Sequence, residues 1–346
     1  MALFLASLFT TVTLGGAWSL LVRTDVITDL EPFFSLTTVA RVWGDPALRT
    51  AGLQFALASH FILLCHELGH WFACRHHRLD ATPPFFLPSP FGLGTLGAFI
   101  RIRSAIARKR ELLDVGVSGP LAGFVALVPI LALGVAWSEP ASLASAPAVG
   151  ESLLLYRPGS SLLLEGLTRL FHGPLPAGTV LNPHPLLLAG WLGLFATMLN
   201  LLPLSQLDGG HILYAAIGRW QRRLAWPMWG ALLLLGLRWP GWWLWSAFVL
   251  LIGVRHPRIY EEALPLDRRG KRLVAAAWVV FVIGFMPEPI AIVELPAHGP
   301  VALDGQVARR EVEHQGHRSV VDQLDRHRGA EAAALDRHAE PGQVLR

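Results

Sequence analysis

Long apolar runs constrain the fold of this chain more than any other feature of its sequence. A helix needs about 20 apolar residues to cross a bilayer, and several runs approach or exceed that length. Only 16% of the 346 residues are charged, whereas soluble domains carry about 25%. We therefore predict an all-α polytopic membrane protein. We expect membrane spans at residues 2–22, 51–74, 113–137, 185–203 and 272–293.

A sixth apolar region, residues 224–254, is interrupted by Arg238-Trp239-Pro240-Gly241. Pro and Gly break helices, so we expect either a turn between two short helices or a kink in one helix. The distribution of charge favours the turn, because basic residues gather on both sides of this region and cytoplasmic loops are enriched in Lys and Arg. About six transmembrane segments follow. The basic segments, expected to be cytoplasmic, are residues 75–110, 219–223 and 255–272.

One apolar run carries the motif His66-Glu67-Leu68-Gly69-His70. Residues four apart lie on one face of a helix, so His66 and His70 can offer two imidazole nitrogens to one metal ion. Zn²⁺ suits such a site, and a catalytic zinc keeps three protein ligands and a water. Glu67 is placed to act as general base for that water. Ionisable groups within a membrane are costly and usually functional, which favours a zinc site over a chance spacing.

The third ligand must come from elsewhere in the chain, and Asp208 is the best candidate. It follows the fourth predicted span and precedes Gly209-Gly210, which we expect to allow an unusual turn that aims the carboxylate inward. Pro203 is expected to end the helix before it. Three competing candidates remain open at this point: His60, Asp114 and His211.

Residues 82–103 are rich in Pro and Gly and also in Phe. This segment is too broken for a helix and too apolar for an ordinary loop. Irregular backbone at membrane depth is tolerated only against protein or a wet cavity, so we predict a re-entrant, β-hairpin-like loop near the active site. Its strand edge could pair with an extended substrate; an interfacial loop with aromatic anchors is the alternative. Further on, Gly119 and Gly123 form a small-xxx-small pair, which predicts close helix packing.

The two ends of the chain differ in character. Residues 1–45 are expected to form an N-terminal membrane helix and a connecting loop, with no cleavable signal peptide. Residues 46–295 form the predicted membrane domain. Residues 296–346 are polar, and we expect them to form a disordered tail. Both cysteines, Cys65 and Cys74, lie in the motif run, so no disulfide framework is predicted.

The motifs together resemble the site-2 protease family of intramembrane zinc metalloproteases. His66–His70 in an early helix is followed by Asn200-Leu201-Leu202-Pro203 and by Leu207-Asp208-Gly209-Gly210. The stretch from Pro83 to Gly123 is similar to the bacterial and plastid branch of the family, as are His256-Pro257, Leu266-Asp267 and Arg269. The resemblance covers roughly residues 50–275. One departure is that no PDZ domain is recognisable, because the connection 138–184 is too short for one.

This resemblance implies a zinc metalloendopeptidase that cleaves membrane protein substrates within or near their transmembrane segments. It makes His66, His70 and Asp208 the zinc ligands and Glu67 the catalytic residue. Asn200 matches a family asparagine that helps hold substrate or the oxyanion, although a packing role is equally compatible with the sequence. We expect a multi-pass protein of the bacterial cell membrane, and no oligomeric state is predicted.

Two other classes of function use the same residues. A metal transporter would use the cluster as a transit site, but the fourth span offers few further polar residues for a path. A non-catalytic scaffold would not need Glu67. Nucleic-acid binding is not expected despite the net charge of +4, because the basic residues flank the apolar spans, where they set orientation and touch anionic headgroups.

Overall fold

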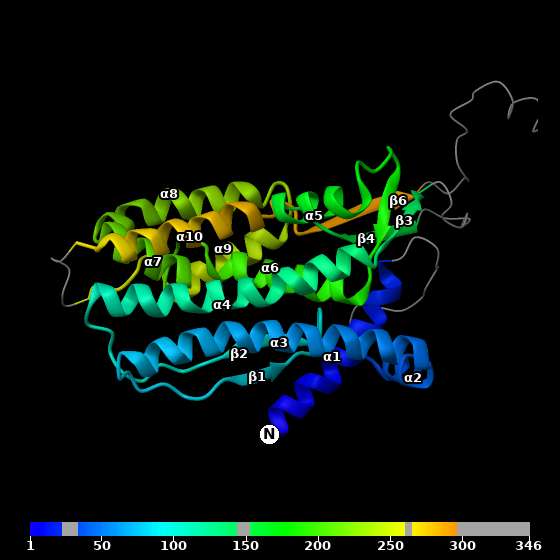
Figure 1. Ribbon diagram of the computed structural model, residues 1–346, viewed down its shortest axis with the longest axis horizontal. Helices are drawn as coiled ribbons and strands as arrows, with labels where there is room; N and C mark the ends of the chain where they lie inside the picture. The colour runs from blue at the N-terminus through cyan, green and yellow to red at the C-terminus, as the bar shows by residue number, and fades with distance from the viewer. Residues whose placement is uncertain (23–33, 144–152, 260–264, 296–346) are drawn as a thin grey trace, which may run out of the picture. The chain divides into compact units, whose positions relative to one another are not determined.

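The computed structural model describes residues 1–22, 34–143, 153–259 and 265–295. The predicted tail, residues 296–346, lies outside the described residues. The described chain is mostly helical. Its helices are α1 (Ala2–Leu21), α2 (Leu36–Gly44), α3 (Pro46–His76), α4 (Lys109–Ala136), α5 (Leu162–His172), α6 (Pro185–Asn200), α7 (Asp208–Ile217), α8 (Trp220–Leu235), α9 (Gly241–Ile252) and α10 (Arg268–Gly284) (Figure 1).

The strands are β1 (Phe85–Pro88), β2 (Thr95–Phe99), β3 (Glu139–Ser142), β4 (Leu153–Pro158), β5 (Thr179–Asn182) and β6 (Ile290–Leu295). They form three separate antiparallel pairs, β1 with β2, β3 with β5, and β4 with β6. The prediction of a helical protein is confirmed in that the described chain is mostly helical, but the pairs β3–β5 and β4–β6 were not predicted. Strand pairing across long separations was not visible in the sequence, because β6 lies more than 130 residues after β4 and the pattern of each strand is short.

Three helices, α1, α3 and α4, are long and apolar enough to cross a membrane. They coincide with the first three predicted spans. Large apolar side chains on the outer face of α3, among them Leu53, Leu57 and Phe61, are exposed, as lipid-facing residues would be. The chain is accordingly a multi-pass membrane protein. The helices α6 and α9 are apolar but shorter, so a total of six spans stays a prediction.

The last predicted span, residues 272–293, is wrong at both ends. Helix α10 begins earlier, at Arg268, where the Asp267 side chain caps it by accepting from the N–H of Gly270 at 2.7 Å. It ends at Gly284 because Pro287 and Pro289 follow, and the residue before a proline disfavours the helical conformation. The chain then enters β6, which pairs with β4.

The break predicted inside residues 224–254 is present. Helix α8 ends at Leu235 and α9 begins at Gly241, and the two lie side by side (Figure 1). The indole N–H of Trp229 in α8 donates to the carbonyl of Ser246 in α9 at 2.9 Å. The helical hairpin predicted from the sequence is therefore confirmed.

Residues 82–103 contain a β-hairpin, as predicted. Phe85 pairs with Phe99 and Phe86 with Ala98, and the register shifts between Leu87 and Pro88. Strand β1 contacts α1 and strand β2 contacts α3. The Thr10 hydroxyl donates to the Gly94 carbonyl at 2.6 Å, which fastens the turn to α1. Whether the hairpin re-enters a membrane stays a prediction.

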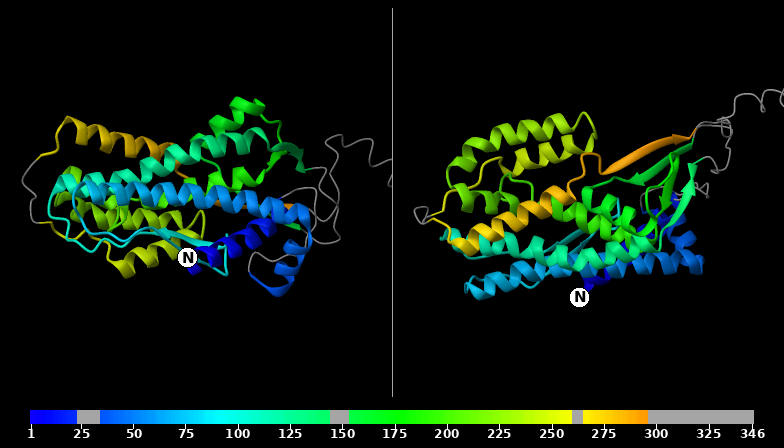
Figure 2. Two further views of the ribbon diagram at one scale, coloured as in Figure 1. Left: turned by 60° about the horizontal axis from the view of Figure 1, so that its bottom comes forward. Right: turned by 45° about the horizontal axis from the view of Figure 1, so that its top comes forward.

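The main core lies where α3, α4 and α6 meet. Its fully or nearly fully buried side chains are Ile62, Leu127, Leu131, Leu187, Trp191 and Leu194. Figure 2 shows α3 and α4 running alongside each other, and β4–β6 with α5 at one end of this helical body. Helices in a membrane are held together by close packing of side chains and not by their removal from water, so the interlocking of these apolar side chains fixes the relative positions of the three helices.

Candidate metal centre

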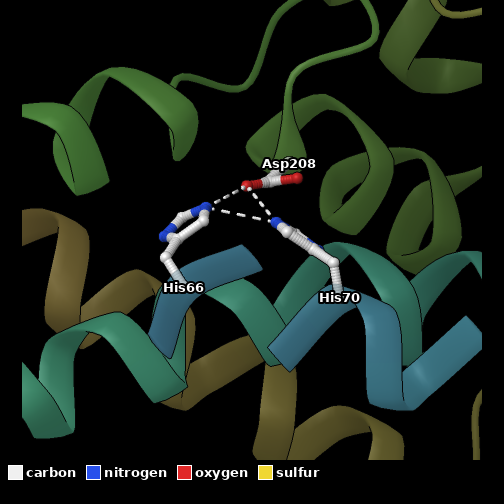
Figure 3. Close-up of side chains that lie close together, drawn as sticks. All are labelled: His66, His70 and Asp208. Atoms are coloured by element: carbon white, nitrogen blue, oxygen red, sulfur yellow. Dashed lines mark hydrogen bonds and ion pairs between the residues drawn. The ribbon is translucent and has the colours of Figure 1, made fainter. Parts of the chain in front are cut away.

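His66 and His70 lie one turn apart on α3, and both are buried. Their Nε2 atoms are 3.1 Å apart. Helical periodicity places them on one face, the face that α3 turns toward α4 and α7 rather than toward lipid. The two imidazoles predicted to act together are thus brought together (Figure 3).

Asp208 joins them from α7, although it lies 142 residues after His66 in the chain. Its Oδ2 atom is 3.4 Å from Nε2 of His66 and 3.2 Å from Nε2 of His70 (Figure 3). Among the described residues this is the one group of three or more His, Cys, Asp or Glu side chains close enough to share a metal ion. The structure therefore assembles the three residues that the sequence analysis nominated.

The expected role of Gly209-Gly210 is wrong. Both lie in the first turn of α7, and neither has a positive φ angle; the left-handed residue is Ser205, with φ 54°. The glycines are needed for close approach instead. A Cβ atom on Gly209 would lie 2.0 Å from the carbonyl oxygen of Leu201, and one on Gly210 would lie 2.4 Å from that of Ser205. They let α7 start directly against the preceding loop, which sets the position of Asp208.

The donor set fits zinc. A tetrahedral zinc ion with bonds of about 2.0–2.1 Å places neighbouring donor atoms about 3.3–3.4 Å apart. The three separations here are 3.1, 3.2 and 3.4 Å. Two imidazole nitrogens and one carboxylate oxygen are also ligands that zinc accepts, and three protein ligands leave one position open.

The orientation of His70 is fixed by a backbone group. Its Nδ1 atom donates to the carbonyl of Val115 in α4 at 2.7 Å, so in the neutral ring Nε2, which faces the cluster, is the nitrogen free to bind a metal. Histidine ligands usually donate their second ring N–H in this way. This contact was not predicted, and no residue pattern could have shown it, because every residue has a backbone carbonyl.

Helix α4 approaches α3 at its glycines. A Cβ atom on Gly119 would lie 2.1 Å from Nε2 of His70, and one on Gly123 would lie 3.1 Å from the ring of His66. On α3, a Cβ atom on Gly69 would lie 2.4 Å from the carbonyl oxygen of Ser118. The predicted small-xxx-small pair is therefore a packing feature, and the space it leaves is occupied by the two histidines.

Glu67 and Asn200 flank the cluster without belonging to it. Glu67 is buried at 9% exposure, and its carboxylate interacts with the backbone of Ile100, just after β2. The hairpin thus reaches the predicted catalytic base. The side-chain amide of Asn200, at the end of α6, lies 3.3 Å from Nε2 of His66. This amide therefore borders the donor set.

The three competing candidates for the third ligand contact residues outside the donor cluster. His60 bonds Ser7 at 3.1 Å. Asp114 contacts His77 at 3.0 Å and Arg110 at 2.9 Å. His211 contacts Nε2 of His256 at 2.7 Å. Burial lowers the pKa of His256, which favours its neutral form. None of the three belongs to the donor cluster.

The sequence profile described as Peptidase family M50 matches residues 54–235. The matched segment contains the cluster, Glu67 and Asn200. It covers slightly more than half of the chain, since 182 of 346 residues are matched.

Curated plant proteins are similar to the chain. A probable zinc metalloprotease EGY1, chloroplastic, of Arabidopsis thaliana is 32% identical over 244 residues, covering 68% of this chain and 43% of the relative. Its Oryza sativa subsp. japonica counterpart is 34% identical, covering 46% and 27%. A probable zinc metalloprotease EGY2, chloroplastic, of Oryza sativa subsp. indica is 36% identical, covering 49% and 30%. The chain thus spans less than half the length of these relatives. No solved structure matches the chain.

Proposed function

The chain belongs to peptidase family M50, and from this premise we propose that it is a zinc metalloendopeptidase that hydrolyses peptide bonds within or near transmembrane segments of membrane proteins. One observation carries the proposal. Three donor atoms from α3 and α7 converge at 3.1–3.4 Å within a multi-pass membrane protein, beside the buried carboxylate of Glu67.

His66, His70 and Asp208 are the proposed zinc ligands. Zinc bound there supplies a Lewis acid that polarises a carbonyl oxygen and lowers the pKa of a bound water molecule to about 7. The contribution of the protein to this chemistry is to fix the positions of the ligand side chains. Val115 fixes the ring of His70, and the close contact of α7 with the preceding loop fixes Asp208.

Glu67 is the proposed general base. Its carboxylate accepts a proton from the attacking water and then transfers it to the amine of the departing peptide. The adjacent position of His66 keeps this carboxylate near the reacting atoms, and the backbone of Ile100 limits its orientation. Asn200, at 3.3 Å from His66, is placed to donate from its amide to the substrate carbonyl oxygen as negative charge develops there.

Substrate recognition is proposed to involve the β1–β2 hairpin. A helical substrate hides its carbonyls in hydrogen bonds, so the scissile segment must first become extended. The hairpin connects to Glu67 through Ile100, and an extended segment could add to its edge. We further propose the bacterial cell membrane as the location; the curated relatives are named as chloroplastic.

The test compares wild type with Glu67→Gln in a purified membrane preparation. Zinc content is measured by atomic absorption, and cleavage of a single-span model substrate is followed by mass spectrometry. We expect Glu67→Gln to keep stoichiometric zinc and to lose cleavage by about 100-fold or more, in keeping with the contribution of a general base. Cleavage at the wild-type rate by Glu67→Gln would remove Glu67 from the catalytic role.

The same preparation separates the alternative classes. A metal transporter would carry zinc across proteoliposomes and leave the substrate intact. A scaffold would bind the substrate without cutting it. Wild-type cleavage that requires zinc, without zinc flux, distinguishes the protease from both.

A further inference from the structure

A cavity lies away from the metal centre. It has a volume of about 860 Å³ and is formed by the end of β4, by α5, by the segment from β5 into α6, by the turn between α8 and α9, and by residues 287–291. None of the proposed zinc ligands lines it. Apolar residues such as Leu187 form part of the wall, and the charged residues at its surface are Arg157, Arg169, Arg238, Glu165 and Glu288.

The charged residues on this cavity do not all pair with one another. Glu165 lies 3.9 Å from Arg169 and also accepts from the hydroxyl of Ser160 at 3.3 Å, so this acid is already shared between two partners. Arg157 and Arg238 then face one remaining carboxylate, that of Glu288. The cavity wall therefore has an excess of positive charge.

Arg157 is the residue of this cavity wall that has a buried donor atom without a hydrogen-bond partner among the described residues. It lies near the end of β4, opposite Ala291 in β6. Its Nη1 atom is buried and has no hydrogen-bond partner among the described residues. Leaving a buried donor unsatisfied is costly, and more so when the group is charged. Burial lowers the pKa of this guanidinium, although arginine remains protonated in proteins.

We propose that this cavity binds a phosphate group, with Arg157 as the inner contact and Arg238 at the rim. A guanidinium presents a planar set of donors that matches phosphate oxygens in pairs. An incoming phosphate would satisfy the Nη1 atom and offset the excess of positive charge. The apolar wall and the position of the cavity at the start of α6 suit either a phospholipid headgroup or a free phosphate compound.

The test measures binding by the full chain in a maltoside detergent, which contains no phosphate. Inorganic phosphate and dihexanoyl phosphatidylglycerol are titrated separately by calorimetry, with chloride added to match ionic strength. We expect saturable binding of at least one probe by wild type. Tighter binding of the lipid identifies a headgroup site, and tighter binding of inorganic phosphate identifies a site for soluble phosphate compounds.

Variants connect the binding to Arg157. Arg157→Gln should bind about tenfold more weakly or worse, since it loses a charge-assisted hydrogen bond in a buried setting. Arg157→Lys keeps the charge without the planar donors, so it should be several-fold weaker, and it serves if the Gln variant folds poorly. Arg272→Gln, an exposed position in α10, is the matched control and should bind as wild type does.

Two results would overturn the proposal. One is the lack of saturable binding of either probe by wild type. The other is binding by Arg157→Gln and Arg157→Lys with wild-type affinity. Because the readout is binding and not proteolysis, neither result depends on the proposed zinc chemistry.

Discussion

A Cβ atom on Gly119 would lie 2.1 Å from Nε2 of His70, the atom that we propose binds zinc. Real Cβ atoms do not approach so closely, so Gly119→Ala must displace either the imidazole or helix α4. The ring of His70 cannot swing freely, because its Nδ1 atom is held by Val115. We expect Gly119→Ala to lose most of its zinc, measured by atomic absorption after dialysis.

The matched control is Gly230→Ala. Gly230 also lies inside a helix, α8, and a Cβ atom there would have no neighbour within 4 Å. This variant should keep wild-type zinc and, because alanine favours helices, should unfold at the same or a slightly higher temperature. Full zinc in Gly119→Ala would mean that the space beside His70 is larger than the structure shows.

Asp208 provides the second prediction. Removing its carboxylate leaves two imidazoles, and a structural or catalytic zinc site normally has three protein ligands or more. We expect Asp208→Ala to bind zinc at least about 100-fold more weakly, beyond what loss of an outer-shell contact costs, as measured by competition with a fluorescent chelator. Asp114→Asn, whose carboxylate contacts His77 and Arg110 instead, should keep wild-type zinc affinity. Equal affinities in the two variants would argue against Asp208 as a ligand.

The sequence indicated which three side chains come together, but it did not indicate the contacts that orient them. A spacing of four on a helix is enough to place His66 and His70 together, and an aspartate after an apolar run was the best remaining candidate. The contacts that orient these groups come from backbone atoms, namely the carbonyl of Val115 and the backbone of Ile100. Backbone groups are identical at every position, so no residue pattern reveals them.

An element of the fold could be predicted where the pattern that specifies it lies within one short segment of the sequence. Apolar runs located α1, α3 and α4, and the Pro-Gly break located the turn between α8 and α9. The β4–β6 pair was missed because its partners are far apart in the chain, and the extent of α10 was overestimated because apolar character continues past Pro287 into a strand. Composition reports burial or lipid contact and does not by itself show where a helix ends.

The third prediction concerns the anchoring of the β-hairpin. The hydroxyl of Ser7 in α1 bonds Nε2 of His60 in α3 at 3.1 Å and donates to the hydroxyl of Thr95 in β2 at 3.2 Å. One small side chain therefore joins three elements. Ser7→Val should loosen β2 and speed amide hydrogen exchange in residues 95–99. Thr50→Val, which removes only an exposed contact within α3, should leave that exchange unchanged, and equal protection in both variants would show that Ser7 is not an anchor.

The fourth prediction separates two roles of Asp267. Its Oδ1 atom accepts from the N–H of Gly270 at 2.7 Å, which caps α10, and from Arg110 in α4 at 2.8 Å. Exposed ion pairs contribute little, whereas losing a cap costs about 1 kcal/mol. Asp267→Asn, which still caps, should unfold nearly as wild type, and Asp267→Ala should be less stable by about 1 kcal/mol in thermal unfolding. A large loss in Asp267→Asn would instead assign the stability to the ion pair.

The fifth prediction is a pH dependence at His184. Its Nδ1 atom accepts from the N–H of Leu186 at 3.2 Å and so caps α6, a role that only an unprotonated Nδ1 can serve. Burial lowers the pKa of His184 below its ordinary value of about 6.5. The unfolded chain therefore binds the proton more readily, and this contribution to stability is complete above about pH 6.5 and is lost as the pH falls toward the folded-state pKa.

Asparagine also caps helices but does not titrate, so His184→Asn should show a smaller loss of thermal stability than wild type between pH 7.5 and pH 5. Both proteins are measured in the presence of a chelator, so that release of zinc does not contribute to the difference. Parallel stability curves would mean that protonation of His184 does not disturb the cap. A variant less stable than wild type at both pH values would show that the imidazole ring contributes mainly through packing, for example against Trp137, whose ring centroid lies 5.4 Å away.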